Sequence, residues 1–325
     1  MQIDPILRAL ADPTRLRIMR LLSAMELAVG ELAQVLGQSQ PRVSRHVKIL
    51  CDAGLAERRK EGSWVFLKSA IAEDRDLAAP TLSGATTRLL AAAEHDDAAF
   101  AARCAEDRRH LAAIRAGRES SAAAYFERNA VQWDDLRRLV SDDAPVEAAL
   151  EGALLKNGNL GAMLDVGTGT GRMAELFSPH ASHVTAFDKS PEMLRIARAR
   201  LQHLPTSGVS LVQGDFTDLP FKPGAFDTVL FHQVLHFAQA PELVLAQAAR
   251  VTRPGGRIAV VDLAAHEREE MRSTHAHARL GFTDGQMADL FTGAGFEPAA
   301  PLALPGGQLT VKIWTGQRTD APAAA

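Results

Sequence analysis

Cysteine is scarce in this chain, whose 325 residues include only Cys51 and Cys104. Two separate thiols cannot build a disulfide framework or a cysteine metal centre, so no metal site is expected. No apolar run approaches the roughly 20 residues that a membrane span requires. The first residues, Met1–Pro5, lack the basic and apolar regions of a secretory signal. We therefore expect a cytoplasmic protein without a membrane partner.

The net charge argues neither for nor against a nucleic-acid partner, because 36 basic and 39 acidic residues give a net charge of only −3. Between Ser39 and Lys68, however, seven basic residues stand against three acidic ones, which makes +4 locally and −7 for the remainder. A basic patch on an acidic chain is typical of a phosphate-contacting surface, although a solvated basic face gives the same pattern.

The length favours two domains, and the first is read from its helical periodicity. Residues 5–25 predict two helices, separated at Asp12-Pro13-Thr14, with Asp12 capping the second. The following elements are predicted to be two short helices and a hairpin: Val29–Leu36 closed by Gly37, Pro41–Ala53 capped by Ser39 and closed by Gly54, and Leu55–Leu67 with its turn at Lys60–Ser63. This order predicts a winged helix-turn-helix domain over residues 1–75.

The remaining chain has a different pattern. Residues 76–150 are Ala-rich and predict connecting or dimerising helices. From Asn159, short apolar strands alternate with helices, which predicts βαβ units and a parallel sheet in an α/β domain over 151–316. Residues 317–325 predict a disordered tail. The six predicted strands are Ala162–Val166, His183–Phe187, Val209–Gln213, Phe226–Phe231, Arg257–Asp262 and Leu309–Thr315.

The second helix of a helix-turn-helix enters the major groove of DNA. In Pro41–Ala53 the apolar Val43, Val47 and Leu50 recur at helical spacing and should face the core. Gln suits adenine and Arg suits guanine, while Ser and Lys suit bases or phosphates. The candidates for DNA contact are Gln40, Arg42, Ser44, Arg45 and Lys48, with His46 able to face either way, and Arg59 and Lys60 on the wing.

Residues 5–70 resemble the ArsR family of winged-helix repressors, through Ala9–Arg15, Leu27–Leu36 and Val43–Leu50. The resemblance implies a homodimer on a palindromic operator in double-stranded DNA. Members often sense metals through a cysteine pair, but Ala28 and Gly30 stand at those positions here. A soft-metal site of that type therefore cannot form, and any inducer is expected to be read elsewhere.

A second motif is the glycine-rich turn Gly167-Thr168-Gly169-Thr170-Gly171, which lets the backbone approach a ligand closely. Arg172 stands where a dinucleotide-binding fingerprint has Gly or Ala, and Asp165 makes the turn unfavourable for a pyrophosphate. Asp188 ends the next strand, where it can bind two ribose hydroxyls. Asp215 follows the third strand, where it can accept from an adenine amino group. Together these residues predict a nucleoside site.

This series resembles the class I S-adenosylmethionine-dependent methyltransferases over residues 120–316, including Pro254–Arg257. Residues Phe226–His236 are similar to the fourth motif of small-molecule members related to quinone methylases. The resemblance implies a Rossmann-like, doubly wound, seven-stranded α/β fold. It also implies S-adenosylmethionine as cofactor, with S-adenosylhomocysteine as product or effector. The residues implied to bind it are Asp165, Gly167, Thr168, Gly169, Gly171, Asp188, Lys189, Met193, Gly214, Asp215, Phe216 and His232. Tyr125, Phe126 and Trp133 fit either a lid over the cofactor or ordinary helix packing.

The class of methyl acceptor is limited mainly by motifs that the sequence lacks. No Asn/Asp-Pro-Pro-Tyr/Phe motif follows the fourth strand, and neither cysteine follows a proline, so DNA is a poor acceptor. Methylation of arsenite would need several thiolates, and the chain has only two cysteines, so arsenite is also a poor acceptor. Candidate general bases are His232 and His236, with further histidines in segment 265–277.

Two functional hypotheses stay open, and both predict cofactor binding. In the first, a regulator senses S-adenosylmethionine or S-adenosylhomocysteine as an effector. In the second, an active small-molecule methyltransferase regulates its own or neighbouring genes. A weaker third hypothesis makes the first domain a dimerisation scaffold.

Overall fold

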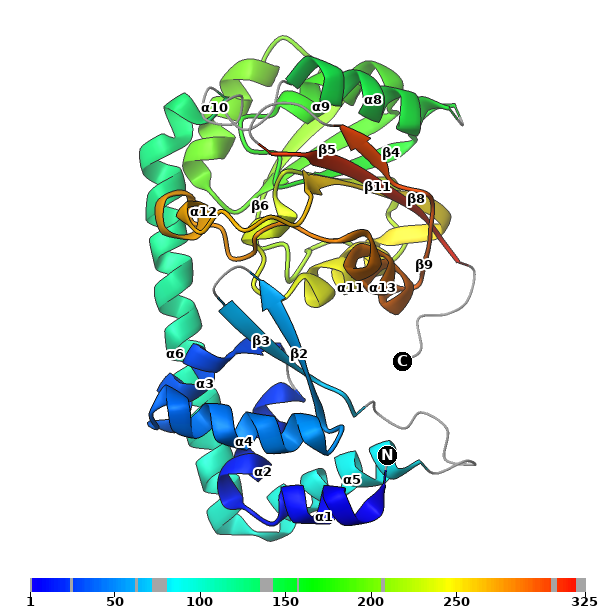
Figure 1. The fold of residues 1–325 in the computed structure, drawn as a ribbon. Coiled ribbons are helices and arrows are strands. Elements are labelled where there is room, and N and C mark those ends of the chain that lie inside the picture. Colours follow the sequence, from blue (N-terminus) through cyan, green and yellow to red (C-terminus); the bar gives the residue numbers. More distant parts are fainter. Residues whose placement is uncertain are drawn as a thin grey trace. The chain divides into compact units, whose positions relative to one another are not determined.

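The computed structural model describes residues 2–23, 26–61, 64–71, 81–134, 143–156, 158–205, 208–304 and 309–319. The chain divides into two compact units, Met1–Ser120 and Ser121–Ala325 (Figure 1). The division falls inside one helix of 32 residues, α6 (Ala98–Asn129). It therefore lies within the segment 76–150, for which the sequence predicts helices.

The first unit contains helices followed by a hairpin, as predicted. Its helices are α1 (Ile3–Leu10), α2 (Pro13–Leu22), α3 (Val29–Leu36), α4 (Gln40–Asp52), α5 (Leu82–Asp96) and the first part of α6. Its antiparallel sheet has the order β1-β3-β2, with β1 (Leu27–Ala28), β2 (Ala56–Glu61) and β3 (Trp64–Ser69). Residues 62 and 63 of the predicted hairpin turn lie outside the described residues.

Local capping explains where these helices begin and end. The Asp12 side chain accepts a hydrogen bond from the Arg15 backbone N–H at 3.1 Å, which confirms the predicted cap of α2. Gly37 ends α3 in the left-handed conformation with φ +63°. Ser39 occupies the N-cap position of α4 but makes no side-chain capping bond, so its predicted capping role was wrong.

Two ionic clusters tie α2 to α5 and α6. Arg17 on α2 donates through two nitrogens to the carboxylate of Asp107 on α6, with its Nε 2.7 Å away. Arg20 on α2 and Arg108 on α6 both donate to Glu94 on α5, each at 2.6 Å. Asp107 is 1% exposed, so its charge depends on Arg17 for compensation.

The second unit is built on one mixed sheet with strand order β10-β11-β8-β7-β4-β5-β6, and β9 also pairs with β11. The strands β4 to β8 run parallel, whereas β11 is antiparallel to β8. Their bounds are β4 (Ala162–Val166), β5 (His183–Asp188), β6 (Val209–Gln213), β7 (Phe226–His232), β8 (Thr252–Leu263), β9 (Phe296–Pro298), β10 (Leu302–Leu304) and β11 (Val311–Arg318).

The predicted Rossmann-like architecture is confirmed, with corrections at one side of the sheet. Within the described residues the sheet has eight strands rather than seven, and the two strands that the sequence did not predict, β9 and β10, both pair with β11. The prediction that a disordered tail begins at residue 317 was wrong for residues 317 and 318. Both belong to β11, where Gln317 pairs with Arg257 and Arg318 pairs with Phe296. Residues 320–325 lie outside the described residues.

Both faces of the sheet are apolar and buried under helices, because alternate residues of the strands belong to two different apolar clusters. Met163 and Leu230 lie in one cluster, while their neighbours Leu164 and Val229 lie in the other. The helical elements of this unit are the last part of α6, η1 (Ala130–Gln132), α8 (Asp143–Leu155), α9 (Arg172–Phe177), η2 (Ser178–His180), α10 (Pro191–Leu201), η3 (Leu235–Phe237), α11 (Pro241–Val251), α12 (Glu270–His275) and α13 (Asp284–Ala294).

The parallel strands β4 to β8 bring their carboxyl ends to one edge of the sheet, where the glycine-rich turn begins after β4. Of the helices that the structure describes, none is long and apolar enough to cross a membrane.

Candidate functional site

The glycine-rich turn between β4 and α9 requires glycine by its geometry. Gly167 has φ +71° and donates its N–H to the Phe187 carbonyl at 2.7 Å. A Cβ at this position would lie 2.3 Å from Val234 Cγ2. Gly169 and Gly171 also have positive φ, at +54° and +84°. The backbone of this turn is therefore held in a shape that ordinary residues would strain.

Two predicted carboxylates are built into this turn. Asp165, the penultimate residue of β4, is fully buried and accepts a hydrogen bond from the Thr168 hydroxyl at 2.6 Å. Asp188 ends β5 and accepts from the backbone N–H groups of Gly169 and Ser190, both at 2.8 Å. Burial raises the pKa of Asp188, although these backbone donors oppose the shift. The turn and the end of β5 are thus joined through one carboxylate.

A third carboxylate, Asp215, follows β6. Lys189 donates to its Oδ2 at 2.7 Å, and Thr217 donates to its Oδ1 from the backbone at 2.9 Å and from the hydroxyl at 2.6 Å. Burial alone would raise the pKa of Asp215, but these donors outweigh it and the pKa is lowered. At Gly214 the backbone passes close to the Phe187 ring, because a Cβ at this position would lie 2.7 Å from that ring.

The other predicted cofactor residues occupy the same edge of the sheet in different environments. Met193, in the first turn of α10, is 2% exposed. His232 is the last residue of β7 and is also buried, whereas Phe216 is half-buried against the apolar core. The next residue after His232, Gln233, has φ +52°, an uncommon conformation for a side-chain-bearing residue.

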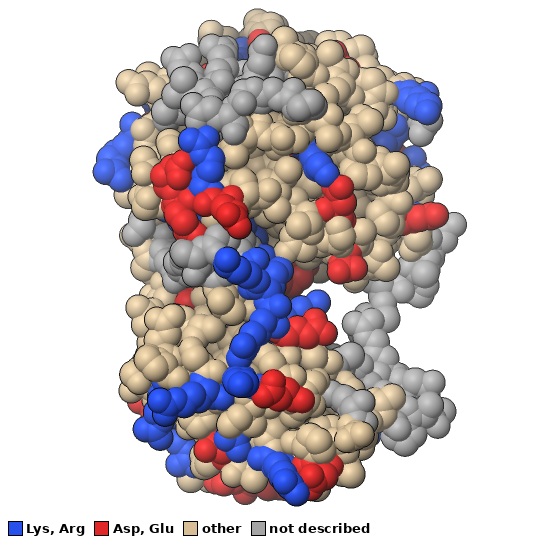
Figure 2. Space-filling model, in the orientation of Figure 1, with Lys and Arg blue, Asp and Glu red and all other residues tan. Residues whose placement is uncertain are grey.

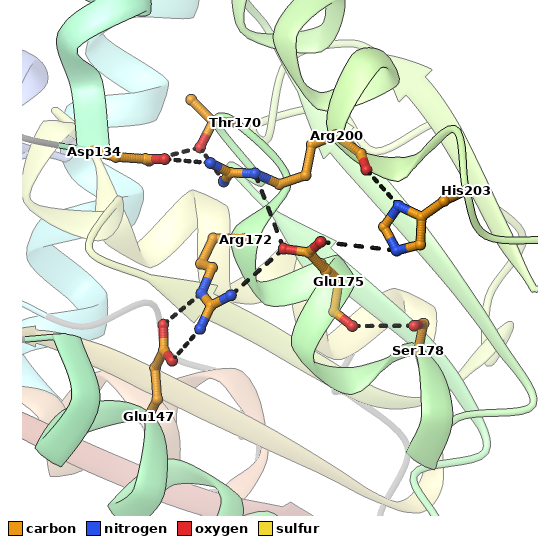
Figure 3. Close-up of polar contacts among 8 residues, drawn as sticks. All are labelled: Asp134, Glu147, Thr170, Arg172, Glu175, Ser178, Arg200 and His203. Carbon is orange, nitrogen blue, oxygen red and sulfur yellow. Dashed lines mark hydrogen bonds and ion pairs between the residues drawn. The ribbon is translucent and has the colours of Figure 1, made fainter.

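Charged side chains outside the predicted set brace the turn (Figure 3). Thr170 donates to Asp134 at 2.7 Å, and Arg200 on α10 donates to both Thr170 and Asp134. Arg172 stands at the position where a dinucleotide-binding fingerprint has Gly or Ala. It donates two hydrogen bonds to Glu147 on α8, at 2.8 and 2.6 Å. Hydrogen bonding to Glu147 raises the pKa of Arg172.

An aromatic cluster lies beside this turn and combines the suggested lid residues with η3. The Phe126 ring centroid lies 5.4 Å from that of Trp133 and 4.8 Å from that of Phe237. The Trp133 Nε1 would lie 3.5 Å from a Cβ on Gly169. The Tyr125 hydroxyl bonds to His275 Nδ1 at 3.0 Å. The lid residues thus pack with one another and next to the glycine-rich turn.

His236, one of the two predicted base candidates, forms a buried pair with Asp262. Its Nδ1 lies 2.7 Å from Asp262 Oδ1, and its backbone N–H donates to Oδ2 at 3.1 Å. The side chains of His236 and Asp262 are 5% and 0% exposed. The His277 ring lies 4.1 Å from that of His236, and burial strongly lowers the pKa of His277. His277 is therefore neutral near pH 7.

In the first unit, α4 has the predicted buried apolar face and exposed polar face. Val43, Val47 and Leu50 are buried, and the polar residues Gln40, Arg42, Ser44, Arg45 and Lys48 are exposed. His46 is half-buried, with Nδ1 3.7 Å from Asp12 Oδ1. Figure 2 shows Lys and Arg side chains along the face of this unit that carries α4 and the β2–β3 hairpin.

The two predicted wing residues differ in their surroundings. Lys60 is exposed. Arg59 is bound within the unit instead, with both carboxylate oxygens of Glu26 accepting at 2.9 and 3.1 Å and its guanidinium 5.0 Å from the Phe66 ring centroid. At the positions of the absent thiolates, Ala28 is buried and Gly30 has open space around it.

Sequence reasoning missed Asp262, Asp134, Glu147 and Arg200. Asp262 could have been noticed, because it is the last residue of the predicted strand Arg257–Asp262, and Asp165 and Asp188 also lie within one residue of the ends of their predicted strands. Asp134 carries no comparable signal, since its partner Arg200 lies 66 residues away in the chain.

Comparisons with known proteins match both halves of the chain. Residues 164–260 match the family model described as a methyltransferase domain. Residues 12–58 match the model described as bacterial regulatory protein, arsR family. The malonyl-[acyl-carrier protein] O-methyltransferase of Herminiimonas arsenicoxydans is 33% identical over 203 residues, which cover 60% of this chain and 70% of that protein. The chain belongs to the methyltransferase family.

Further methyltransferases align over shorter stretches. The phosphatidylethanolamine N-methyltransferase of Cereibacter sphaeroides is 35% identical over 41% of this chain and 66% of that protein. The demethylmenaquinone methyltransferase of Thermobifida fusca is 32% identical over 43% of this chain and 60% of that protein. This family member thus spans between 40% and 70% of the length of its curated relatives.

Among solved structures, the 1,6-didemethyltoxoflavin-N1-methyltransferase of Burkholderia thailandensis, with bound 1,6-didemethyltoxoflavin and S-adenosylhomocysteine, is similar in fold. The match has a TM-score of 0.50 and 23% identity, and it covers 62% of this chain and 90% of that one. It supports the class I methyltransferase fold of the second unit, which follows an ArsR-type domain in the same chain.

Proposed function

We propose that this protein is a DNA-binding transcriptional regulator whose methyltransferase domain binds S-adenosylmethionine and methylates a small molecule. The observation that carries the cofactor assignment is the Asp188 carboxylate, which joins the end of β5 to Gly169 of the glycine-rich turn. Each Asp188 oxygen can accept more than one hydrogen bond, so the carboxylate keeps capacity for ribose hydroxyls.

The other residues at this edge suit the remaining parts of the cofactor. The glycine-rich turn lets the cationic methionine portion approach the backbone closely, and the buried Asp165 carboxylate lies just before that turn. Asp215 and Phe216 suit the adenine rim, and Met193 suits its face. When bound, S-adenosylmethionine supplies an electrophilic methyl group on a sulfonium and leaves as S-adenosylhomocysteine.

Calorimetric titration with S-adenosylhomocysteine tests this site directly. Asp188→Ala should weaken binding at least 30-fold, because it removes the ribose acceptor and loosens Gly169. Asp289→Ala, an exposed carboxylate on α13, should bind within twofold of the wild type. Absence of binding to the wild type, or equal binding by Asp188→Ala, would overturn the assignment.

A second proposal concerns the first unit, in which α4 reads a palindromic operator as part of a homodimer. The exposed polar set on α4 supports it, because packing does not require those side chains. The positions of Ala28 and Gly30 offer no thiolate, so we propose that the methyltransferase domain replaces the missing sensor. S-adenosylmethionine or S-adenosylhomocysteine would then be the effector.

Selection of binding sites from a random-sequence duplex DNA pool tests the DNA-reading proposal. The wild type should enrich a palindrome, and Arg45→Ala should lose that enrichment while S-adenosylhomocysteine binding stays unchanged. Arg195→Ala, an exposed arginine on α10, is the matched control and should enrich the same palindrome. If Arg45→Ala enriches the wild-type palindrome, α4 is not the reading helix.

A further inference from the structure

We propose that His236 is the general base of this methyltransferase and that its acceptor is a neutral aromatic hydroxyl, with Asp262 as the positioning residue. The inference rests on the proposed methyltransferase function and adds the proton acceptor and the substrate class to it. Its basis is the buried His236–Asp262 pair, together with the aromatic, histidine and arginine side chains near the His236 ring.

The hydrogen bonds of the pair determine which ring nitrogen can act. Asp262 Oδ1 accepts from the Leu263 backbone N–H at 2.7 Å and lies 2.7 Å from His236 Nδ1. A carboxylate only accepts, so Nδ1 carries the proton and Nε2 holds the lone pair. Among the described residues Nε2 has no hydrogen-bond partner, and it is not an enclosed atom. This arrangement is the one that a general base needs.

The pair lies at the same edge of the sheet as the cofactor residues. His236 follows β7 and Asp262 lies at the end of β8, and β7 is hydrogen-bonded to β4, which leads into the glycine-rich turn. Val234, two residues before His236, is the residue that a Cβ on Gly167 would meet at 2.3 Å. The base is therefore on a short segment that touches the turn.

The aromatic side chains indicate the shape of the acceptor. The Phe237 ring lies 4.1 Å from the His236 ring and 4.8 Å from Phe126, which in turn neighbours Trp133. Aromatic side chains of this kind favour a flat ring through offset or edge-to-face contacts. A planar aromatic acceptor matches these contacts better than an extended polar chain does.

The charge environment favours a neutral acceptor. His277 lies beside His236, and burial lowers its pKa, with His236, His266, His275 and Arg272 adding further positive repulsion. The same environment disfavours an ammonium acceptor. Asp262 supplies a counter-charge for a protonated His236, because the two groups are in direct hydrogen-bonding contact. The acceptor position can therefore take up one proton at His236 but disfavours an acceptor that carries a positive charge of its own.

The transfer balances without a further reagent. The hydroxyl proton of the acceptor passes to Nε2 of His236, and the oxygen forms the new bond to the methyl carbon. The electron pair of the broken carbon–sulfur bond stays on sulfur, which becomes a thioether. The proton on His236 then returns to solvent.

His236→Asn separates the chemical role from the structural one. The asparagine Nδ2 can take the place of Nδ1 as the donor to Asp262, so the buried carboxylate keeps its partner, but no basic atom stands at the position of Nε2. His203→Asn is the matched control, because His203 is exposed and contacts Glu175 on another element (Figure 3). Both variants should bind S-adenosylhomocysteine within threefold of the wild type.

The readout is the ionisation of bound 4-nitrophenol, whose phenolate absorbs visible light, in protein saturated with S-adenosylhomocysteine. At a pH where the free probe is mostly neutral, the wild type and His203→Asn should show bound phenolate. His236→Asn should show at least tenfold less. Methylation of a phenol panel should fall at least 100-fold in the same variant.

Asp262 is tested by pH, because a merely structural role would not move the profile. Asp262→Asn should shift bound phenolate formation to higher pH, and Asp262→Glu, which keeps the charge, should restore the wild-type profile at least in part. A wild-type profile in Asp262→Asn would overturn the positioning role.

The possible failures are distinct. If the wild type does not bind S-adenosylhomocysteine, the proposed function fails. If it binds S-adenosylhomocysteine but no 4-nitrophenol, the acceptor class is wrong. If His236→Asn forms as much bound phenolate as the wild type, the assignment of the base is wrong while the cofactor site stands.

Discussion

A single missing Cβ atom controls the shape of the glycine-rich turn. Gly167→Ala places a methyl group 2.3 Å from Val234 Cγ2 at a φ of +71°, so both a clash and backbone strain oppose it. We expect the free energy of unfolding to fall by about 2–4 kcal/mol. Urea denaturation measures this change.

Gly293→Ala is the control for that measurement, because it adds the same methyl group in open space on α13. Alanine is the better helix former, so stability should stay constant or rise by up to about 1 kcal/mol. Equal losses in both variants would contradict the account of Gly167.

Single residues also show the limit of sequence reasoning. Asp165, Asp188 and Asp215 could be grouped in advance, because parallel strands end at one edge of a sheet. The pairing of His236 with Asp262 could not, because it depends on how η3 turns back toward β8. Arg59 shows another limit, since the sequence predicts phosphate contact by a wing arginine but gives no sign that Glu26 accepts its hydrogen bonds.

Among the elements, α6 is tied to α2 by the buried Arg17–Asp107 pair. Asp107→Ala leaves the Arg17 guanidinium without its partner, so we expect unfolding to become easier by about 3 kcal/mol. Glu127→Ala removes an exposed carboxylate from the same helix and should change stability by less than about 0.5 kcal/mol. Thermal and urea unfolding of both variants check the difference.

The tie between α2, α5 and α6 through Glu94 should depend on pH. The hydrogen bond from Arg108, opposed by burial and aided by Arg20, lowers the pKa of Glu94. A lowered carboxyl pKa contributes stability that is complete above the unfolded pKa of about 4.3 and is lost as pH falls through the folded value.

Glu94→Gln should therefore be less stable than the wild type at neutral pH, and the gap should narrow as pH falls below about 4. Denaturant titrations at several pH values measure it. A gap of constant size down to pH 2 would show that the charge of Glu94 does not matter.

Element boundaries were predictable where a local signal marks them. Asp12 and Gly37 fix helix ends through short-range hydrogen bonds and a positive φ, and both were identified correctly. The strands β9 and β10 contain three residues each and give no alternating pattern, so only pairing with β11 defines them.

For the whole molecule, the coupling of operator and cofactor is the main prediction. If the methyltransferase domain acts as the sensor, operator affinity at fixed salt should differ at least fivefold between cofactor-free and S-adenosylhomocysteine-saturated protein. Asp188→Ala should remove that difference without changing basal affinity. Fluorescence anisotropy with the selected palindrome measures both, and equal affinities would exclude sensing.

The fold of each unit followed from sequence because periodicity changes sharply between them, from helical spacing to short apolar strands. Whether and how the two units are coupled did not follow from the sequence, because coupling is a free-energy difference between states and no residue pattern encodes it directly.

Because the division at Ser120 and Ser121 falls within α6, the two halves cannot be separated at a loop. A fragment cut there would leave up to four backbone carbonyls without partners on one side and four N–H groups on the other. Anyone dissecting this protein should therefore let both fragments overlap through the full length of α6.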